Sequence, residues 1–187
     1  MSWRVALIAL AVVAAVALLA WLLHGGGARQ PAEVIPAVEL PTPTPAPEQR
    51  ILLLFTGNDG LLHPELRNVP FPEEPLERIR VVMRELLAGP GTSQGLAPVV
   101  PYQAQLEAVF IDPDGNAFVD LTAPPEPLQG SSTELLLAYG VVDSILLNCP
   151  TINAVQILFG GREVPTLTGH LDFSKPLVLN KRFIAAS

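Results

Sequence analysis

The chain has 187 residues, with 11 basic and 18 acidic side chains and a formal net charge of −7. We expect no nucleic-acid partner, because binding phosphates needs clustered Lys and Arg side chains. The single cysteine excludes an internal disulfide framework and a cysteine-rich zinc site, and three widely spaced histidines disfavour a histidine metal centre. Hydrophobic residues make up 49% and charged residues 16%, an imbalance that is typical of a chain with a membrane segment.

Residues 5–23 form an apolar run without charge, Gly or Pro. At about 1.5 Å per residue, a helix of this length spans roughly 28 Å, close to the ~30 Å hydrocarbon core of a bilayer. Trp3 and Trp21 bracket the run, and indole side chains favour the two headgroup layers. The segment is therefore predicted to be a transmembrane helix, which makes the lipid bilayer the first expected partner.

The flanking charges of this segment are nearly balanced, but the very short N-terminal tail favours N-in, C-out insertion. We predict an uncleaved signal anchor in the cell (inner) membrane, with residues 1–4 as a cytoplasmic tail and the C-terminal domain extracytoplasmic, or periplasmic. A cleaved signal peptide is the alternative, because Ala15-Val16-Ala17 is a small-x-small site. That site lies inside the apolar run, and the run is long for a signal peptide.

Residues 24–49 are predicted to be a linker, since they contain three consecutive glycines and six prolines. Such a segment cannot bury apolar area and favours an extended, polyproline-like conformation. It would hold a folded head, residues 50–187, away from the bilayer.

The elements of the head follow from hydrophobic periodicity and turn residues. We predict a buried strand at 50–56, a short edge segment at 61–67 limited by Pro64, a helix at 75–88, strands at 106–112 and 117–121 around the turn 113–116, a helix at 131–148 that begins with the capping box Ser131-x-x-Glu134, a strand at 155–159, and a mostly irregular tail at 167–183. This order predicts an α+β domain of the βαββαβ type. Its two layers would be one sheet and two helices on one face of that sheet.

Two patterns that suggest a ligand site have ordinary structural explanations. Gly89-x-Gly91-x-x-x-Gly95 follows a helix end, whereas a dinucleotide loop lies between a strand and a helix start. Asp112-x-Asp114-x-Asn116 has alternating oxygen ligands, as calcium loops have, but its glycine is at the wrong position and these residues favour a hairpin turn.

Catalytic candidates are equally weak in the sequence. Cys149 is expected to be a structural cysteine, because a nucleophile needs a histidine close in space. His170, Asp172 and Ser174 alternate along an extended segment, which places them on one face without the relay geometry of a triad. Paired carboxylates for glycoside cleavage stay open, although the head has no tryptophan for a sugar platform. We therefore assign no catalytic, cofactor-binding or metal-binding residue.

The head contains a series of motifs whose order resembles that of the GerM-type (GerMN) sporulation and spore-germination domain. They are Leu53-Leu54-Phe55, Gly60-Leu61-Leu62-His63-Pro64-Glu65-Leu66-Arg67, Leu86-Leu87-Ala88-Gly89-Pro90, Asp120-Leu121-Thr122, Val155-Gln156-Ile157-Leu158-Phe159-Gly160-Gly161 and Gly169-His170-Leu171-Asp172-Phe173-Ser174-Lys175-Pro176. Each motif is weak alone, but their order and spacing cover nearly all of residues 50–187.

This resemblance implies an extracytoplasmic domain without known catalysis. Its fold would be similar to the ring-building modules of secretion and sporulation assemblies, which associate side by side through sheet and helix faces. The chain differs from the best-known members in two ways: it has one such domain instead of a tandem pair, and it has no lipobox cysteine.

The leading hypothesis is thus a non-enzymatic, membrane-anchored envelope protein whose head associates with a protein partner or with itself. Arg78, Arg80 and Arg84 on the first helix of the head, together with its acidic remainder, are a candidate charge-complementary pair. The alternative is a binding module for peptidoglycan or another envelope polymer, with cell-wall contact. A hydrolase is the third hypothesis and would need a convergent triad or carboxylate pair.

Overall fold

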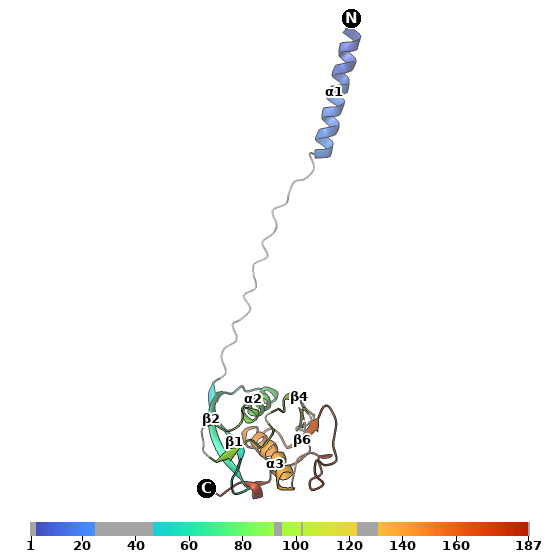
Figure 1. Cartoon of the computed structure of the whole chain (residues 1–187). Coiled ribbons are helices and arrows are strands. Elements are labelled where there is room, and N and C mark those ends of the chain that lie inside the picture. Colours follow the sequence, from blue (N-terminus) through green and yellow to red (C-terminus); the bar gives the residue numbers. More distant parts are fainter. Residues whose placement is uncertain (1–2, 25–46, 92–94, 102, 123–130, 187) are drawn as a thin grey trace. The chain divides into compact units, whose positions relative to one another are not determined.

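The computed structural model describes residues 3–24, 47–91, 95–101, 103–122 and 131–186 (Figure 1). For residues 4–9, 23, 24 and 131 it describes the backbone only. The chain divides into two compact units, Met1–Pro43 and Thr44–Ser187. The first unit contains helix α1, and the second contains all other helices and strands. Most of the predicted linker at 24–49 lies outside the described residues.

Helix α1 extends from Trp3 to His24 and contains the predicted segment 5–23. Within the part of the chain that the structure describes, no helix is both long and apolar enough to cross a membrane. The structure thus contains a helix at the predicted segment. It does not support the predicted membrane crossing, which stays a prediction from the sequence.

In its described residues, the head has two three-stranded sheets, which differ in strand direction. The first has the order β2-β1-β3 and is antiparallel, and the second has the order β4-β5-β6 with β4 antiparallel and β6 parallel to β5. The strands are β1 (Glu48–Gly57), β2 (Leu62–Pro70), β3 (Leu96–Ala97), β4 (Leu106–Ile111), β5 (Asn116–Leu121) and β6 (Ala154–Phe159). The helices are α2 (Pro75–Leu87), α3 (Ser131–Asn148) and the short η1 (Lys181–Phe183).

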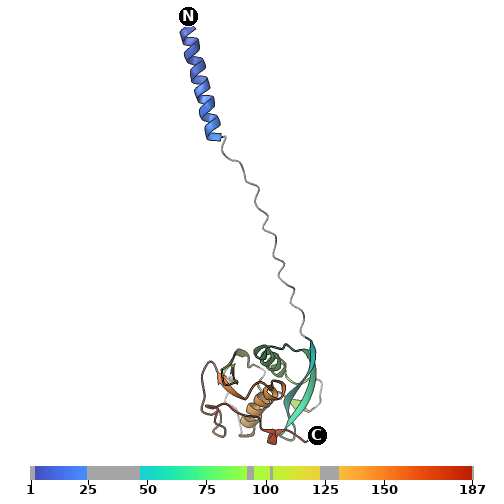
Figure 2. The same cartoon turned by 180° about the vertical axis from the view of Figure 1, so that it is seen from behind.

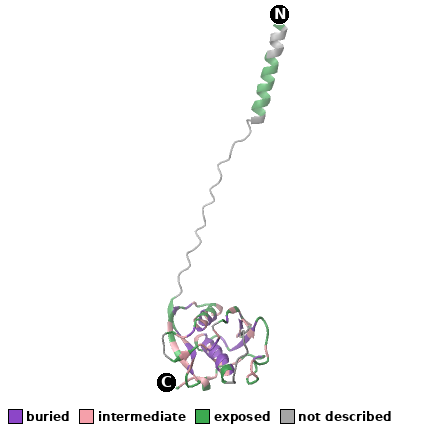
Figure 3. Cartoon of the chain, in the orientation of Figure 1, coloured by how far each residue is buried: buried purple, intermediate pink, exposed green. Residues whose placement is uncertain are grey.

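Helix α3 lies between the two sheets (Figures 1 and 2). It contacts β1 of the first sheet and β6 of the second, and as the crossover between β5 and β6 it makes these strands parallel. Figure 3 shows α3 mostly in the colour of buried residues. Its buried residues include the consecutive Leu136, Leu137 and Ala138. Consecutive helical residues point about 100° apart, so a helix that buries all three must be covered on several sides. The predicted α+β class is confirmed, whereas the predicted single sheet with both helices on one face is wrong.

Helix α2 confirms the helix predicted at 75–88. Its N-terminus is capped by Glu74, whose carboxylate accepts hydrogen bonds from the backbone N–H groups of Leu76 and Glu77 at 3.1 and 2.7 Å. Gly89, with a φ of 82°, follows the helix in the left-handed conformation that ends it. The helix packs against α3, β1 and β4 through the face that contains Ile79, Val82, Met83 and Leu86.

Strand β2 is longer than the short edge segment predicted at 61–67. Pro64 does not shorten it, because this proline has its nitrogen on the open side of the strand. The Phe71 N–H donates to the Pro47 carbonyl at 3.0 Å, so odd-numbered residues of β2 direct their backbone groups to β1 and even-numbered ones direct them away. A proline at an outward position removes no ladder hydrogen bond.

The C-terminal segment joins the two sheets. Leu177 forms an antiparallel bridge with Val155 of β6, with backbone hydrogen bonds of 2.9 and 2.8 Å. The Ala185 N–H then donates to the Leu62 carbonyl of β2 at 2.9 Å. The tail is otherwise irregular, as the sequence predicted, and these bridges hold it against both sides of the core.

Candidate functional site

The residues His170, Asp172 and Ser174 do not form a catalytic relay. The Ser174 hydroxyl donates to the Asp172 carboxylate, which also accepts the Ser174 N–H and has a lowered pKa for that reason. The imidazole of His170 instead faces Thr168, with Nδ1 3.1 Å from its hydroxyl oxygen. A triad needs the histidine next to the nucleophile, and here the serine is bonded to the carboxylate.

The Asp112-x-Asp114-x-Asn116 pattern closes a hairpin turn. One oxygen of Asp112 accepts the N–H groups of Asp114 and Asn116 at 2.9 and 2.8 Å, and the other accepts the Asn116 side-chain amide at 2.9 Å. These bonds, led by that amide, lower the pKa of Asp112. Among the described residues, no group of three or more His, Cys, Asp or Glu side chains could hold a metal ion.

Cys149 is fully buried at the end of α3, which agrees with the structural role expected for it. Burial raises the pKa of its thiol to about 11. Because the thiolate is the reactive form of cysteine, this side chain is unreactive at neutral pH.

The three arginines of α2 are engaged within the chain. Arg78 donates to the Gln49 side-chain oxygen at 3.3 Å, and its guanidinium carbon lies 4.5 Å from the centroid of the Phe71 ring. Arg80 lies 2.6 Å from Glu77, and Arg84 lies 3.3 Å from Glu85. When an arginine forms an ion pair with a carboxylate of the same chain, the negative charge offsets the positive one, and a partner protein is attracted less strongly. The structure therefore adds no support for the charge-complementary surface that the sequence suggested.

Two buried carboxylates on α3 hold the C-terminal segment, and the sequence did not single out either of them as a functional residue. The Glu134 carboxylate accepts the N–H groups of Leu167, Thr168 and His170 at 2.7 to 2.9 Å, and hydroxyl groups from Thr166 and Thr168. Burial alone would raise the pKa of Glu134, but these donors outweigh it and lower the pKa to about 2. The side chain of Ser131 lies outside the described residues, so the predicted capping box stays a prediction, while the Glu134 oxygens bind a loop far along the chain.

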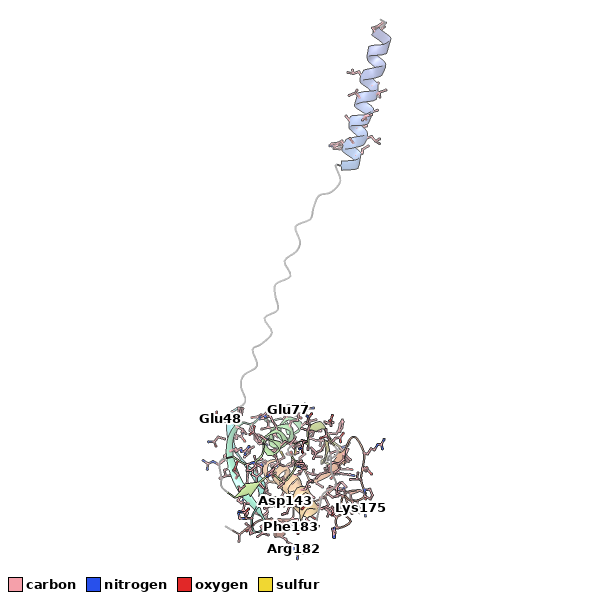
Figure 4. The ribbon with its side chains drawn as sticks, in the orientation of Figure 1. Glu48, Glu77, Asp143, Lys175, Arg182 and Phe183 are labelled. Atoms are coloured by element: carbon pink, nitrogen blue, oxygen red, sulfur yellow. The ribbon has the colours of Figure 1, made fainter. Side chains whose placement is uncertain are left out.

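Asp143 has fewer partners. Its Oδ1 accepts the Asn180 N–H at 3.0 Å, while Oδ2 is buried and has no hydrogen-bond partner within the part of the chain that the structure describes. Burial raises the pKa of this carboxyl to about 6. Figure 4 marks Asp143 together with Arg182 and Phe183, at the side of the head where α3 meets the C-terminal segment. Only the tertiary contact identifies this residue, because Asn180 is distant in the sequence.

The second sheet has an outer face, opposite to the face that lines the core. The strand register places Phe110, Phe118 and Gln156 side by side on it. Gln156 is buried, and its amide nitrogen lies 3.5 Å from the Phe173 carbonyl of the C-terminal segment. Phe110 on β4 is 59% exposed. The outer face is thus covered over β6 and open over β4, where an apolar ring meets solvent.

Comparison with known proteins identifies the family of this head. Residues 52–165, more than half of the chain, match the family model Germane, described as "Sporulation and spore germination". The chain belongs to the Germane family. No curated protein matches the sequence.

Solved structures share the fold of this Germane domain at low sequence identity. The tandem GerMN domains of the sporulation protein GerM from Bacillus subtilis are 17% identical, with a TM-score of 0.54 over 71% of this chain and 46% of that one. The first GerMN domain of the same protein is 18% identical, with a TM-score of 0.52 over 70% and 97%. A candidate lipoprotein from Clostridium perfringens is 21% identical, with a TM-score of 0.51 over 73% and 92%. The predicted GerM-type resemblance is confirmed.

Two of the motifs that carried the resemblance are joined in the Germane domain. The Glu65 carboxylate accepts hydrogen bonds from Arg67 Nε at 2.8 Å and from the Gly91 N–H at 3.0 Å. Arg67 also donates to the backbone carbonyls of Glu85 at 2.9 Å and Gly89 at 2.5 Å. These contacts fasten the turn after α2 to β2. The Gly91 N–H is directed at a carboxylate of the same chain, so this glycine-containing loop serves the fold.

Proposed function

We propose that this protein works by protein–protein association through its Germane head, in a cell-envelope assembly connected with sporulation or germination, and without catalysis. The observation that carries the proposal is the open part of the outer face, where the ring of Phe110 is 59% exposed. Covering a large apolar ring removes its surface from water, which favours association, and aromatic rings are enriched at protein interfaces. The Germane family description supports the biological setting.

An apolar surface is preferred over the charged surface of α2 for a physical reason. Arg80 and Arg84 are exposed ion-pair partners of Glu77 and Glu85, and such pairs contribute little to the stability of a fold or an interface. Reversal of Arg80 and Arg84 to Glu is therefore expected to change association less than a change at Phe110.

We further propose that residues 5–23 anchor the chain in the cell membrane, with the head on the extracytoplasmic side. This rests on the apolar sequence of the segment, which is longer than an ordinary signal-peptide core. Changing Val12 and Val16 to Lys places two charges at the centre of the run, at a cost of about 2.5 to 3.5 kcal/mol each in a membrane. The variant should move from the carbonate-washed membrane pellet to the supernatant. Recovery of unaltered full-length protein in the supernatant would contradict the anchor.

The experiment for association is the mass of the full-length protein in nanodiscs, measured by mass photometry over a range of concentrations. A discrete species above one copy, or capture of one defined envelope protein from solubilised membranes, is expected. A monomer that captures no protein but binds purified cell wall would contradict association and favour the polymer-binding alternative.

A further inference from the structure

The edges of the two sheets differ in how they are protected. On β2, Pro64 and Pro70 occupy even-numbered positions, whose nitrogen faces away from β1. Neither can donate a hydrogen bond to an incoming strand, and proline at outward positions is a common protection of edge strands. The Leu62 carbonyl at the same edge already accepts the Ala185 N–H at 2.9 Å. The edge of β2 is therefore a poor site for strand addition.

Strand β4 has no such protection. The Asp112 N–H, directly after β4, donates to the Asn116 carbonyl at 3.0 Å, which sets the alternation of hydrogen bonds in the β4–β5 pair. Phe110 therefore directs its backbone groups to β5, whereas Val109 and Ile111 direct theirs to the open edge. Among the described residues, no partner is found for these outward groups. From Ala108 to Ile111, where the pairing with β5 is regular, the strand contains no proline and no charged side chain, and its one charge, Glu107, lies at the register shift between Leu106 and Ala108.

From this difference we infer that β4 pairs antiparallel with β4 of a second copy of the chain, about a two-fold axis at Phe110. In this register Val109 exchanges backbone hydrogen bonds with Ile111 of the second copy, and the symmetry repeats the same exchange. The two Phe110 rings meet on the outer face and cover each other. The inference rests on the proposed function and names both the partner and the surface.

The arrangement of charges agrees with a second copy as the occupant. In the register centred on Phe110, Glu107 lies opposite Pro113 of the second copy, and Asp112 lies opposite Ala108. No acidic side chain therefore faces another directly, although the chain has a net charge of −7. Like charges directly opposite each other would destabilise a strand pair.

A short strand pair is weak between free molecules, so the test uses the full-length protein in liposomes, where tethering raises the effective concentration. Phe110→Cys places a thiol at the centre of the pair, where opposite Cα atoms of a non-hydrogen-bonded antiparallel pair lie about 4.5 Å apart. Disulfides form when Cα atoms are about 4.4 to 6.8 Å apart. The native Cys149 is fully buried and does not compete.

A mild oxidant should convert the Phe110→Cys protein into a disulfide-linked dimer. The matched control is Leu66→Cys on β2, since Leu66 is 58% exposed and Phe110 is 59% exposed. At the same density in the membrane, the control should remain monomeric. Equal cross-linking of the two variants would overturn the inference, because it would show random collision.

A second pair of variants measures association without a covalent bond. Phe110→Lys should weaken self-association by about tenfold or more, because two charges then face each other in place of two rings. Leu66→Lys should leave it unchanged, and thermal unfolding should show that both variants are folded. If the full-length protein is multimeric and Phe110→Lys does not change its self-association, the β4 pairing is wrong while association stands. If the protein is a monomer at every density and captures a different protein, the β4 pairing is likewise wrong while association stands. If it is a monomer and captures no protein, both proposals are contradicted.

Discussion

At the scale of single residues, Glu134 and Asp143 show how the same helix gives two carboxylates opposite pKa shifts. Both are fully buried on α3. Glu134 accepts several N–H and O–H donors, which stabilise its charged form and lower the pKa to about 2. Among the described residues, Asp143 accepts a hydrogen bond only from the Asn180 N–H, so burial dominates and raises the pKa to about 6. The number of hydrogen-bond donors around each carboxyl in the folded chain decides whether its pKa is raised or lowered.

Asp143→Asn is expected to stabilise the protein at neutral pH. The folded pKa of Asp143 lies above its unfolded value of about 3.8, so ionisation costs stability as the pH rises through about 6. Asn keeps an oxygen for the Asn180 N–H and carries no charge. The variant should gain about 2 kcal/mol at pH 8 and little at pH 4. Chemical denaturation at both pH values measures this, with Asp114→Asn in the exposed turn as the control, and an equal gain at pH 4 would contradict the assignment.

Glu134→Gln is expected to have the opposite effect. The folded pKa of Glu134 lies below its unfolded value of about 4.5, so its contribution is present above that pH and is lost as the pH falls towards 2. In Glu134 both carboxylate oxygens accept hydrogen bonds, whereas the neutral amide of Gln has only one acceptor oxygen. The free energy of unfolding should therefore fall by about 2 to 4 kcal/mol at pH 7. Urea denaturation measures the loss, and Glu163→Gln, which removes an exposed charge in the same loop region, should change little. Hydrogen exchange should increase at residues 166–170 if the carboxylate holds that loop.

At the scale of elements, Gly140 reports how closely α3 is packed. A Cβ added there would lie 2.7 Å from Cγ1 of Val99, which is closer than side chains normally approach. Helix propensity favours Ala over Gly by about 1 kcal/mol, but overpacking costs about 1 to 3 kcal/mol. Gly140→Ala should therefore destabilise the protein in thermal unfolding. Combining it with Val99→Ala should recover part of the loss, and a simple sum of the two single effects would show that the residues do not compete for space.

Element types were predictable wherever one periodicity dominated. The apolar face of α2, with acidic residues around its start and a glycine after its end, identified that helix, and the Pro113-Asp114-Gly115-Asn116 turn identified the β4–β5 hairpin. β2 was underestimated because Pro64 breaks strands only at positions that need its N–H. That position depends on the register with β1, which local sequence does not specify.

At the scale of the whole molecule, the net charge of −7 affects how copies approach each other. Two acidic molecules repel, and salt screens that repulsion. If self-association uses the apolar edge of β4, it should strengthen between about 0.05 and 0.5 M NaCl, and also as the pH falls towards the isoelectric point near 4.9. Mass photometry in nanodiscs measures both trends. An interface built on the arginines of α2 would instead weaken with salt.

The sequence by itself determined the α+β class, the family, the helix at residues 5–23 and the positions of most elements, because hydrophobic period and turn residues are local properties. Only the tertiary structure decided that the strands form two sheets with α3 between them, which carboxylates are buried, and which sheet edge is open. The partners of Glu134, Asp143 and β4 are set by contacts between distant segments. No local pattern records whether a polar group finds a donor, or whether an edge finds a neighbouring strand, once the chain has folded.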